Sequence, residues 1–147
     1  MHKLIASLSL TFCATLASAT TLQYIACTSP GGNVICDTVP NDAGEVIAFQ
    51  RLVIPQVYLG NGVYQPAYSV ITVTVDGTVY TTQPFAYSVT SVATGLQDWN
   101  ETWSGNTVSE VGLPLSFNVQ MHKHKKTCSG RACGTGFTYQ LLGGTVN

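Results

Sequence analysis

The chain has 147 residues, of which 45% are hydrophobic and only 9% are charged, and its formal net charge is −1 at neutral pH. This low and nearly balanced charge disfavours a nucleic-acid partner, because binding to the phosphate backbone draws on an excess of Lys and Arg. The length is sufficient for one domain with a hydrophobic core of its own.

The N-terminus has the pattern of a secretory signal peptide. A short basic start is followed by a mostly apolar run over residues 4–16 and by the small-residue cleavage motif Ala17-Ser18-Ala19. The apolar run is too short to span a membrane as a helix, which needs about 20 residues. We therefore predict a signal peptide over residues 1–19, a mature domain over residues 20–147, an extracellular location and no membrane span.

The number of cysteines is consistent with secretion. Those remaining after the signal are Cys27, Cys36, Cys128 and Cys133. An even number in a secreted chain predicts two disulfides, and three connectivities are open. The local pairing closes two short loops, worth about 2–3 kcal/mol each, whereas joining the two ends of the chain closes loops of about 100 residues, worth about 4–5 kcal/mol each. The local pairing is only slightly favoured.

The first half of the mature chain reads as short strands. Residues 22–27 and 34–38 are rich in strand formers and flank a Pro-Gly-Gly-Asn turn, which predicts a hairpin stapled by its two cysteines. Residues 46–54 predict another strand. The clearest hairpin joins residues 67–75 to residues 78–82 through Asp76-Gly77, a pair typical of two-residue type I′ turns.

The second half ends in two strands with strict alternation. Leu113, Leu115, Phe117, Val119 and Met121 fall on one face and Ser116, Asn118, Gln120 and His122 on the other, as expected for a strand with one buried and one solvated face. A last strand is predicted over residues 137–142. Before these, residues 95–106 read as a long loop or a single helical turn.

About eight short strands separated by turn signals, with no segment of helical period, predict an all-β fold. We expect a single-domain antiparallel β-sandwich or barrel of Greek-key type, stapled by two disulfides.

The segment over residues 122–133, HKHKKTCSGRAC, concentrates the basic side chains of the chain. One interpretation is a loop that docks an anionic or protein partner, because lysines supply point charges and an arginine can grip a carboxylate or phosphate with two hydrogen bonds. The other is a solvated hairpin tip whose lysines discourage edge pairing. The candidate binding residues are His122, Lys123, His124, Lys125, Lys126 and Arg131.

Metal binding and catalysis find little support in the sequence. Two histidines on one strand face are not a metal site, because catalytic zinc needs three protein ligands and structural zinc four. No Gly-x-Ser-x-Gly elbow is present, and only two histidines follow the signal, so a hydrolase triad has few possible parts. We expect no metal, no cofactor and no enzymatic activity.

The motif Asp98-Trp99-Asn100-Glu101-Thr102-Trp103 is a second candidate site. Indole rings can stack on sugars, so Trp99 and Trp103, helped by exposed tyrosines such as Tyr58 or Tyr64, would suit a carbohydrate-binding module. The alternative is that one tryptophan caps the core. Asn100 also begins an Asn-x-Thr glycosylation motif, and a glycan there would shield this segment.

A signal peptide, a small mature domain, four cysteines, few charges and no catalytic set together resemble the small secreted effector-like proteins of plant-associated fungi. The resemblance covers the layout of the whole chain and no diagnostic motif. It implies a β-sandwich that works by binding a host component, here through residues 122–131. A polysaccharide-binding module that uses Trp99 and Trp103 is the alternative.

Overall fold

The computed structural model describes residues 18–84, 87–127 and 136–147. Within these residues the chain is almost entirely β-structure, with no α-helix and a single three-residue 3₁₀ turn, η1 (Pro30–Gly32). None of the described residues forms a helix long and apolar enough to cross a membrane. The strands are β1 (Thr20–Leu22), β2 (Ile25–Cys27), β3 (Val34–Val39), β4 (Ile47–Ile54), β5 (Val57–Gly60), β6 (Val63–Gln65), β7 (Tyr68–Val75), β8 (Thr78–Thr81), β9 (Tyr87–Ala93), β10 (Asp98–Val108), β11 (Pro114–Lys125) and β12 (Phe137–Val146).

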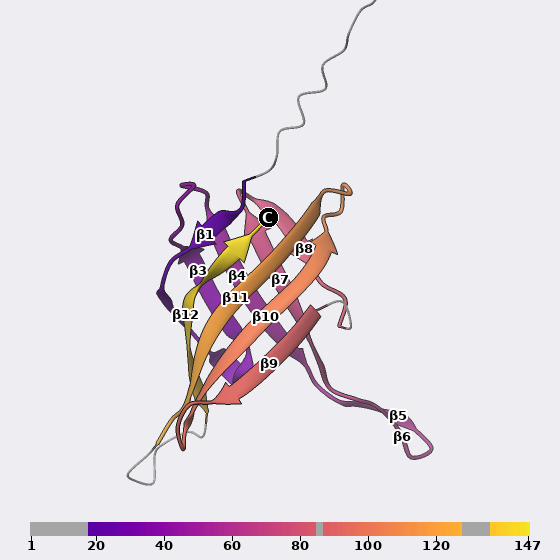
Figure 1. Ribbon diagram of the computed structural model, residues 1–147. Coiled ribbons are helices and arrows are strands. Elements are labelled where there is room, and N and C mark those ends of the chain that lie inside the picture. The colour runs from indigo at the N-terminus through magenta and orange to yellow at the C-terminus, as the bar shows by residue number, and fades with distance from the viewer. Residues whose placement is uncertain (1–17, 85–86, 128–135) are drawn as a thin grey trace, which may run out of the picture.

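These strands form antiparallel sheets, which confirms the predicted all-β class. A six-stranded sheet has the order β1-β12-β11-β10-β9 with β2 also paired to β12, and a four-stranded sheet has the order β3-β4-β7-β8. In Figure 1 the larger sheet lies in front of the smaller one, and β5 and β6 project away from both as a hairpin arm. Phe49 and Phe117 pack edge to face across the core that the two sheets share, with ring centroids 6.0 Å apart.

The alternation predicted for β11 and β12 is confirmed. Leu115 to Met121 alternate buried and exposed along β11, and Tyr139 and Leu141 are buried in β12. Leu113 is the exception, because it precedes β11 and is exposed. The hairpin of β7 and β8 is also confirmed, since Asp76 and Gly77 both have positive φ as a type I′ turn requires.

The prediction of a loop or helical turn over residues 95–106 is wrong. Strand β10 occupies most of this region and pairs with β9 on one side and β11 on the other. Its sequence, DWNETWSGNTV, includes Asp98, Asn100, Glu101, Gly105 and Asn106, which are residue types depleted in strands. Pairing on both edges and burial of Trp103 and Glu101 therefore impose the strand where local propensity does not.

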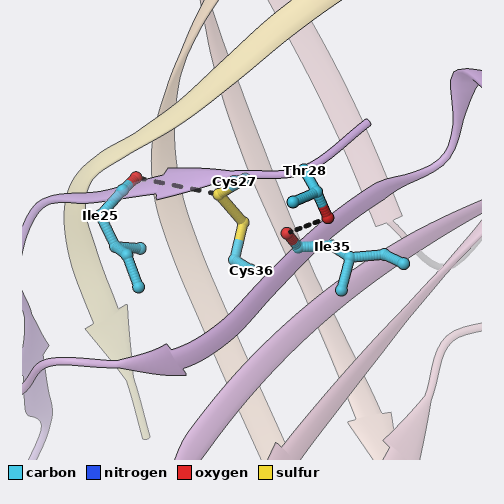
Figure 2. Close-up of a disulfide and its surroundings, with 5 residues drawn as sticks. All are labelled: Ile25, Cys27, Thr28, Ile35 and Cys36. Carbon is cyan, nitrogen blue, oxygen red and sulfur yellow. Dashed lines mark hydrogen bonds between the residues drawn. A yellow bond between two sulfur atoms is a disulfide. The ribbon is translucent and has the colours of Figure 1, made fainter. Parts of the chain in front are cut away.

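The predicted hairpin of residues 22–27 and 34–38 is also wrong. The first segment forms β1 and β2, which pair with β12 in the larger sheet, whereas β3 pairs with β4 in the smaller one. Between β2 and β3 there is one isolated bridge, Thr28 to Ile35, with two backbone hydrogen bonds of 2.8 Å. The disulfide Cys27–Cys36 beside it (Figure 2) therefore ties the two sheets together.

This disulfide is the local pair that the sequence slightly favoured. The other predicted pair, Cys128 and Cys133, lies outside the described residues. The fold also has more strands than the eight expected, and β10, β11 and β12 are long, with 11, 12 and 10 residues. These strands are long because they stay paired with their neighbours across polar residues that, from the sequence alone, resemble turns.

A bulge in β12 changes which side chains face outward near its end. Leu142 is an extra residue opposite the junction of Gln120 and Met121 in β11. After the bulge Val146 is buried, although it lies five positions from the buried Leu141, and Thr145 turns to the outer face. Gly144 permits this, since its φ is 143° and a Cβ there would overlap the backbone of β11.

We predict that the double variant Cys27→Ala/Cys36→Ala is destabilised by about 2–3 kcal/mol, the unfolded-state entropy that a loop of this length removes. Urea unfolding followed by circular dichroism would measure the difference. Thr28→Ala, which keeps the disulfide, should stay close to the wild type. A double variant with the midpoint of the wild type would show that the inter-sheet link contributes nothing.

Candidate functional site

The two segments that the sequence treated as separate sites lie side by side. Strand β10 carries the tryptophan motif and β11 carries the start of the basic segment, and their register pairs Trp99 with Lys123, Asn100 with His122, and Asp98 with His124. Because successive side chains of a strand point to opposite faces, this ladder presents two different sets of groups, one outward and one toward the core.

The outward set is a histidine–carboxylate cluster. Asp98 Oδ1 lies 3.1 Å from His122 Nε2 and 2.8 Å from His124 Nδ1, while His122 Nδ1 lies 3.2 Å from Asn100 Oδ1. The hydrogen bond with His124 is the main influence that holds the pKa of the Asp98 carboxyl below its usual value, and His122 acts in the same direction. The cluster is a partly exposed polar network at the Asp98 end of β10.

The inward set is built on a buried carboxylate. Glu101 is only 3% exposed and accepts a hydrogen bond from Trp103 Nε1 at 2.9 Å. Lys123 Nζ lies 3.4 Å from Glu101 Oε1, and Arg51 Nη1 lies 3.7 Å from Oε2. Arg51 belongs to β4 of the smaller sheet and its guanidinium lies 5.4 Å from the Trp103 ring centre. The carboxylate thus holds cations from both sheets.

Aromatic rings surround the Lys123 ammonium. Its Nζ is 4.2 Å from the centre of the Phe137 ring and 5.9 Å from those of Trp99 and Tyr139, which are distances at which a cation is attracted to a ring face. Burial, reinforced by the Glu101 carboxylate, raises the pKa of the Tyr139 phenol. This end of the core is therefore a packed ionic and aromatic cluster.

The predicted basic site is divided by this arrangement. His122 and His124 lie in the outward cluster, and Lys123 points inward to Glu101. Lys125 and Lys126 are exposed at the end of the ladder, and Arg131 lies outside the described residues. The structure does not present residues 122–126 as one exposed basic surface, because the alternation of β11 sends neighbouring side chains to opposite faces.

The burial of Trp103 contradicts the predicted sugar-binding surface of Trp99 and Trp103. The Trp103 ring is 0% exposed, so it cannot stack on a ligand, and Trp99 is half-buried in edge-to-face contact with Phe137 at 6.1 Å. Tyr58 and Tyr64 are exposed, as expected, and their ring centroids lie 4.9 Å apart. They belong to the arm of β5 and β6, which projects away from the sheet that contains β10 (Figure 1).

No group of three or more metal ligands with the geometry of a metal site occurs in residues 18–84, 87–127 and 136–147. Asn100 of the glycosylation motif is half-buried on the outward face of β10. Its modification stays a prediction, and a glycan there would lie on the same face as the histidines.

Sequence reasoning missed a groove on the outer face of the six-stranded sheet. This groove is largely open to solvent and has a volume of about 510 Å³. It crosses β9, β10, β11 and the end of β12, and its lining residues are Tyr87, Ser88, Ser104, Gly105, Asn106, Ser116, Phe117, Asn118, Thr145 and Asn147. The available signal was the run of Ser and Asn at alternate positions of β11, but the matching positions of β10 were hidden in a predicted loop.

Comparisons of the chain with protein-family models, with curated proteins and with solved structures found no match.

We predict that Glu101→Gln lowers the free energy of unfolding by about 3–5 kcal/mol, because Arg51 and Lys123 would be left without their buried counter-charge. Urea unfolding would measure this, with Glu110→Gln, an exposed carboxylate, as the matched control. A loss below about 1 kcal/mol, the scale of a surface ion pair, would contradict the assignment of Glu101 as the ionic centre of the core.

The lowered pKa of Asp98 makes a second prediction, on acid stability. The unfolded chain protonates this carboxyl near pH 4, before the folded chain does. The stability that Asp98 contributes is therefore present above about pH 4 and is lost as the pH falls through the lowered pKa of the folded state. Asp98→Asn should flatten that part of the profile of thermal midpoint against pH, and Asp37→Asn, an exposed control, should not. Parallel profiles for Asp98→Asn and wild type would refute the prediction.

Proposed function

We propose that this chain is a secreted binding protein whose recognition surface is the outer face of the six-stranded sheet. The single observation that carries this proposal is the groove of about 510 Å³ on that face. Because the groove is largely open to solvent and mostly polar, it suits a ligand that lies across the sheet and forms hydrogen bonds with it.

The composition of the face supports the proposal. Outward positions of the paired strands carry Ser, Thr, Asn, Gln and His side chains, such as Thr102, Ser104, Asn118 and Gln120. These groups form hydrogen bonds without the cost of burying a charge, which suits recognition of a partner that presents many donors and acceptors. We take the two larger sheets as the layers of a sandwich, so that the rigid core supports the face from behind.

Secretion is supported by the predicted signal over residues 1–19 and by the Cys27–Cys36 disulfide, since disulfides persist mainly in oxidising compartments. The resemblance to effector-like proteins of plant-associated fungi implies a host component as the partner. Lys125 and Lys126 are exposed at the border of the same sheet. The proposal therefore includes an electrostatic attraction between the basic segment and the partner.

Capture of partners from an extracellular host extract, with bound proteins and glycans identified by mass spectrometry, tests the proposal. Thr102→Arg/Gln120→Arg places two cations on paired neighbours at the centre of the outer face and should abolish capture. Val79→Arg, on the exposed surface of the smaller sheet, is the matched control and should retain it.

A third variant separates the two candidate surfaces. In Lys125→Ser/Lys126→Ser/Arg131→Ser, capture should persist with at most a weaker response to salt, because charge-driven contacts are screened by ions. Loss of partners in this variant, together with retention in Thr102→Arg/Gln120→Arg, would place recognition in the basic segment and overturn the proposal.

A further inference from the structure

We propose that the outer-face groove binds neutral polysaccharide chains through hydroxyl and amide groups, an inference that rests on the proposed function and names its ligand class. The Ser, Thr and Asn residues of the lining are Ser88, Ser104, Asn106, Ser116, Asn118, Thr145 and Asn147. Each of these side chains can both donate and accept hydrogen bonds. A sugar presents rows of hydroxyls that also do both, so the two surfaces are complementary in chemistry.

The side chains that line the groove, among the described residues, are uncharged, and this selects against other ligands. Within the part of the chain that the structure describes, no Asp, Glu, Lys, Arg or His side chain belongs to the lining. Phosphate groups and nucleic acids bind through Lys and Arg, and metal ions bind through carboxylates and imidazoles, so neither class finds its partners here. The two aromatic rings at the groove are turned away from it, since Phe117 is buried against Phe49 and the Tyr87 hydroxyl donates to Ser69 O at 2.5 Å in the smaller sheet. A lipid or flat aromatic ligand would lack an apolar floor.

The backbone under the groove is held on both sides. Gly105 of β10 is paired with Tyr87 of β9 and Phe117 of β11, so the floor is continuous sheet. Ser88 Oγ and Ser104 Oγ lie 2.9 Å apart and fix each other across the β9–β10 ladder. Hydroxyls that are already oriented lose little freedom when a ligand binds, which favours recognition by hydrogen bonds alone.

The bulge in β12 extends the polar lining across a third ladder. Because it shifts the face of the strand, Thr145 pairs with Asn118 of β11 on the outer side while Val146 stays in the core. Without the bulge the valine would point outward and Thr145 inward. The groove therefore runs over four neighbouring strands, across which a short stretch of an extended chain of sugars could lie.

The expected interaction is weak and independent of ionic strength. Hydrogen bonds between neutral groups replace hydrogen bonds to water with little net gain, and no indole platform adds stacking. A dissociation constant in the range of about 0.1–1 mM follows for a single site. Added salt should not change it, because no charged side chain of the groove takes part.

Binding to insoluble cellulose, chitin and mannan by co-sedimentation, and to a soluble β-glucan by affinity electrophoresis, tests the inference on the full mature chain. The wild type should bind at least one of these probes. Ser104→Arg fills the middle of the groove and should weaken that binding by about tenfold or more. Asn118→Arg does the same from β11, and the thermal midpoint of each variant should match the wild type.

Two controls locate the site. Val79→Arg adds the same charge on the smaller sheet, and Tyr58→Ser/Tyr64→Ser removes the exposed tyrosines of the arm; both should bind as the wild type does. Binding lost only in the tyrosine variant would move sugar recognition to the arm and overturn the inference. Preference for polygalacturonate, an acidic probe, over every neutral one would overturn it as well.

Different results would refute this inference and the proposed function. If no neutral polysaccharide binds, but Thr102→Arg/Gln120→Arg and Ser104→Arg abolish capture of a host protein, the outer face is the recognition surface and the ligand class is wrong. If all outer-face variants leave every captured partner unchanged, both proposals fall.

Discussion

The carboxylate of Glu101 is the constraint on which the arrangement of the larger sheet depends. A carboxyl group that is 3% exposed needs polar partners to offset the cost of its burial, and its partners come from three places: Trp103 in its own strand, Lys123 in the neighbouring strand and Arg51 in the opposite sheet. These contacts fix which face of β10 points inward. Once Glu101 and Trp103 point to the core, Ser104 and its outward neighbours must point to solvent.

The same parity then determines which side chains lie on the outer face, the proposed recognition surface. Strands β10 and β11 are paired along the whole of β10, so inward anchors in one strand fix the outward positions of both. On the inner side of this ladder, Lys123 and Arg51 pair with the Glu101 carboxylate. The histidines and Asp98 form their own network at one end of the outer side, and the described side chains that line the groove at the other end are uncharged.

Much of the fold could be predicted from the sequence wherever the side-chain pattern and the local propensity agree. In β11 the alternation of Leu115 to Met121 indicates both the strand and its buried face, and Asp76-Gly77 indicates a specific turn. Strand β10 could not be predicted this way, because Asp, Asn, Gly and Glu disfavour strands locally and only pairing and burial outweigh them. The tryptophan motif and the basic segment were therefore predicted as two separate loops. In the structure they lie on neighbouring strands and pair in one ladder, that of β10 and β11.

The predicted hairpin of residues 22–27 and 34–38 was wrong for a similar reason. The spacing of Cys27 and Cys36 fits a hairpin and equally fits two strands that part into different sheets, because a disulfide constrains only the local approach of two Cα atoms, here 4.5 Å apart. Which sheet each strand joins is decided by long-range partners, β12 for one and β4 for the other.

Lys123 shows most directly why residue type alone does not define a site. By composition it belongs to a basic segment that would attract anions, yet the alternation of β11 carries it to the core, where Glu101 neutralises it and three rings surround it. Its neighbours His122 and His124 are carried to the opposite face. A cluster of charges in a strand is therefore two half-clusters of opposite orientation. The surface that remains available for a partner is the one made by polar side chains at alternate positions, which no count of charges would single out.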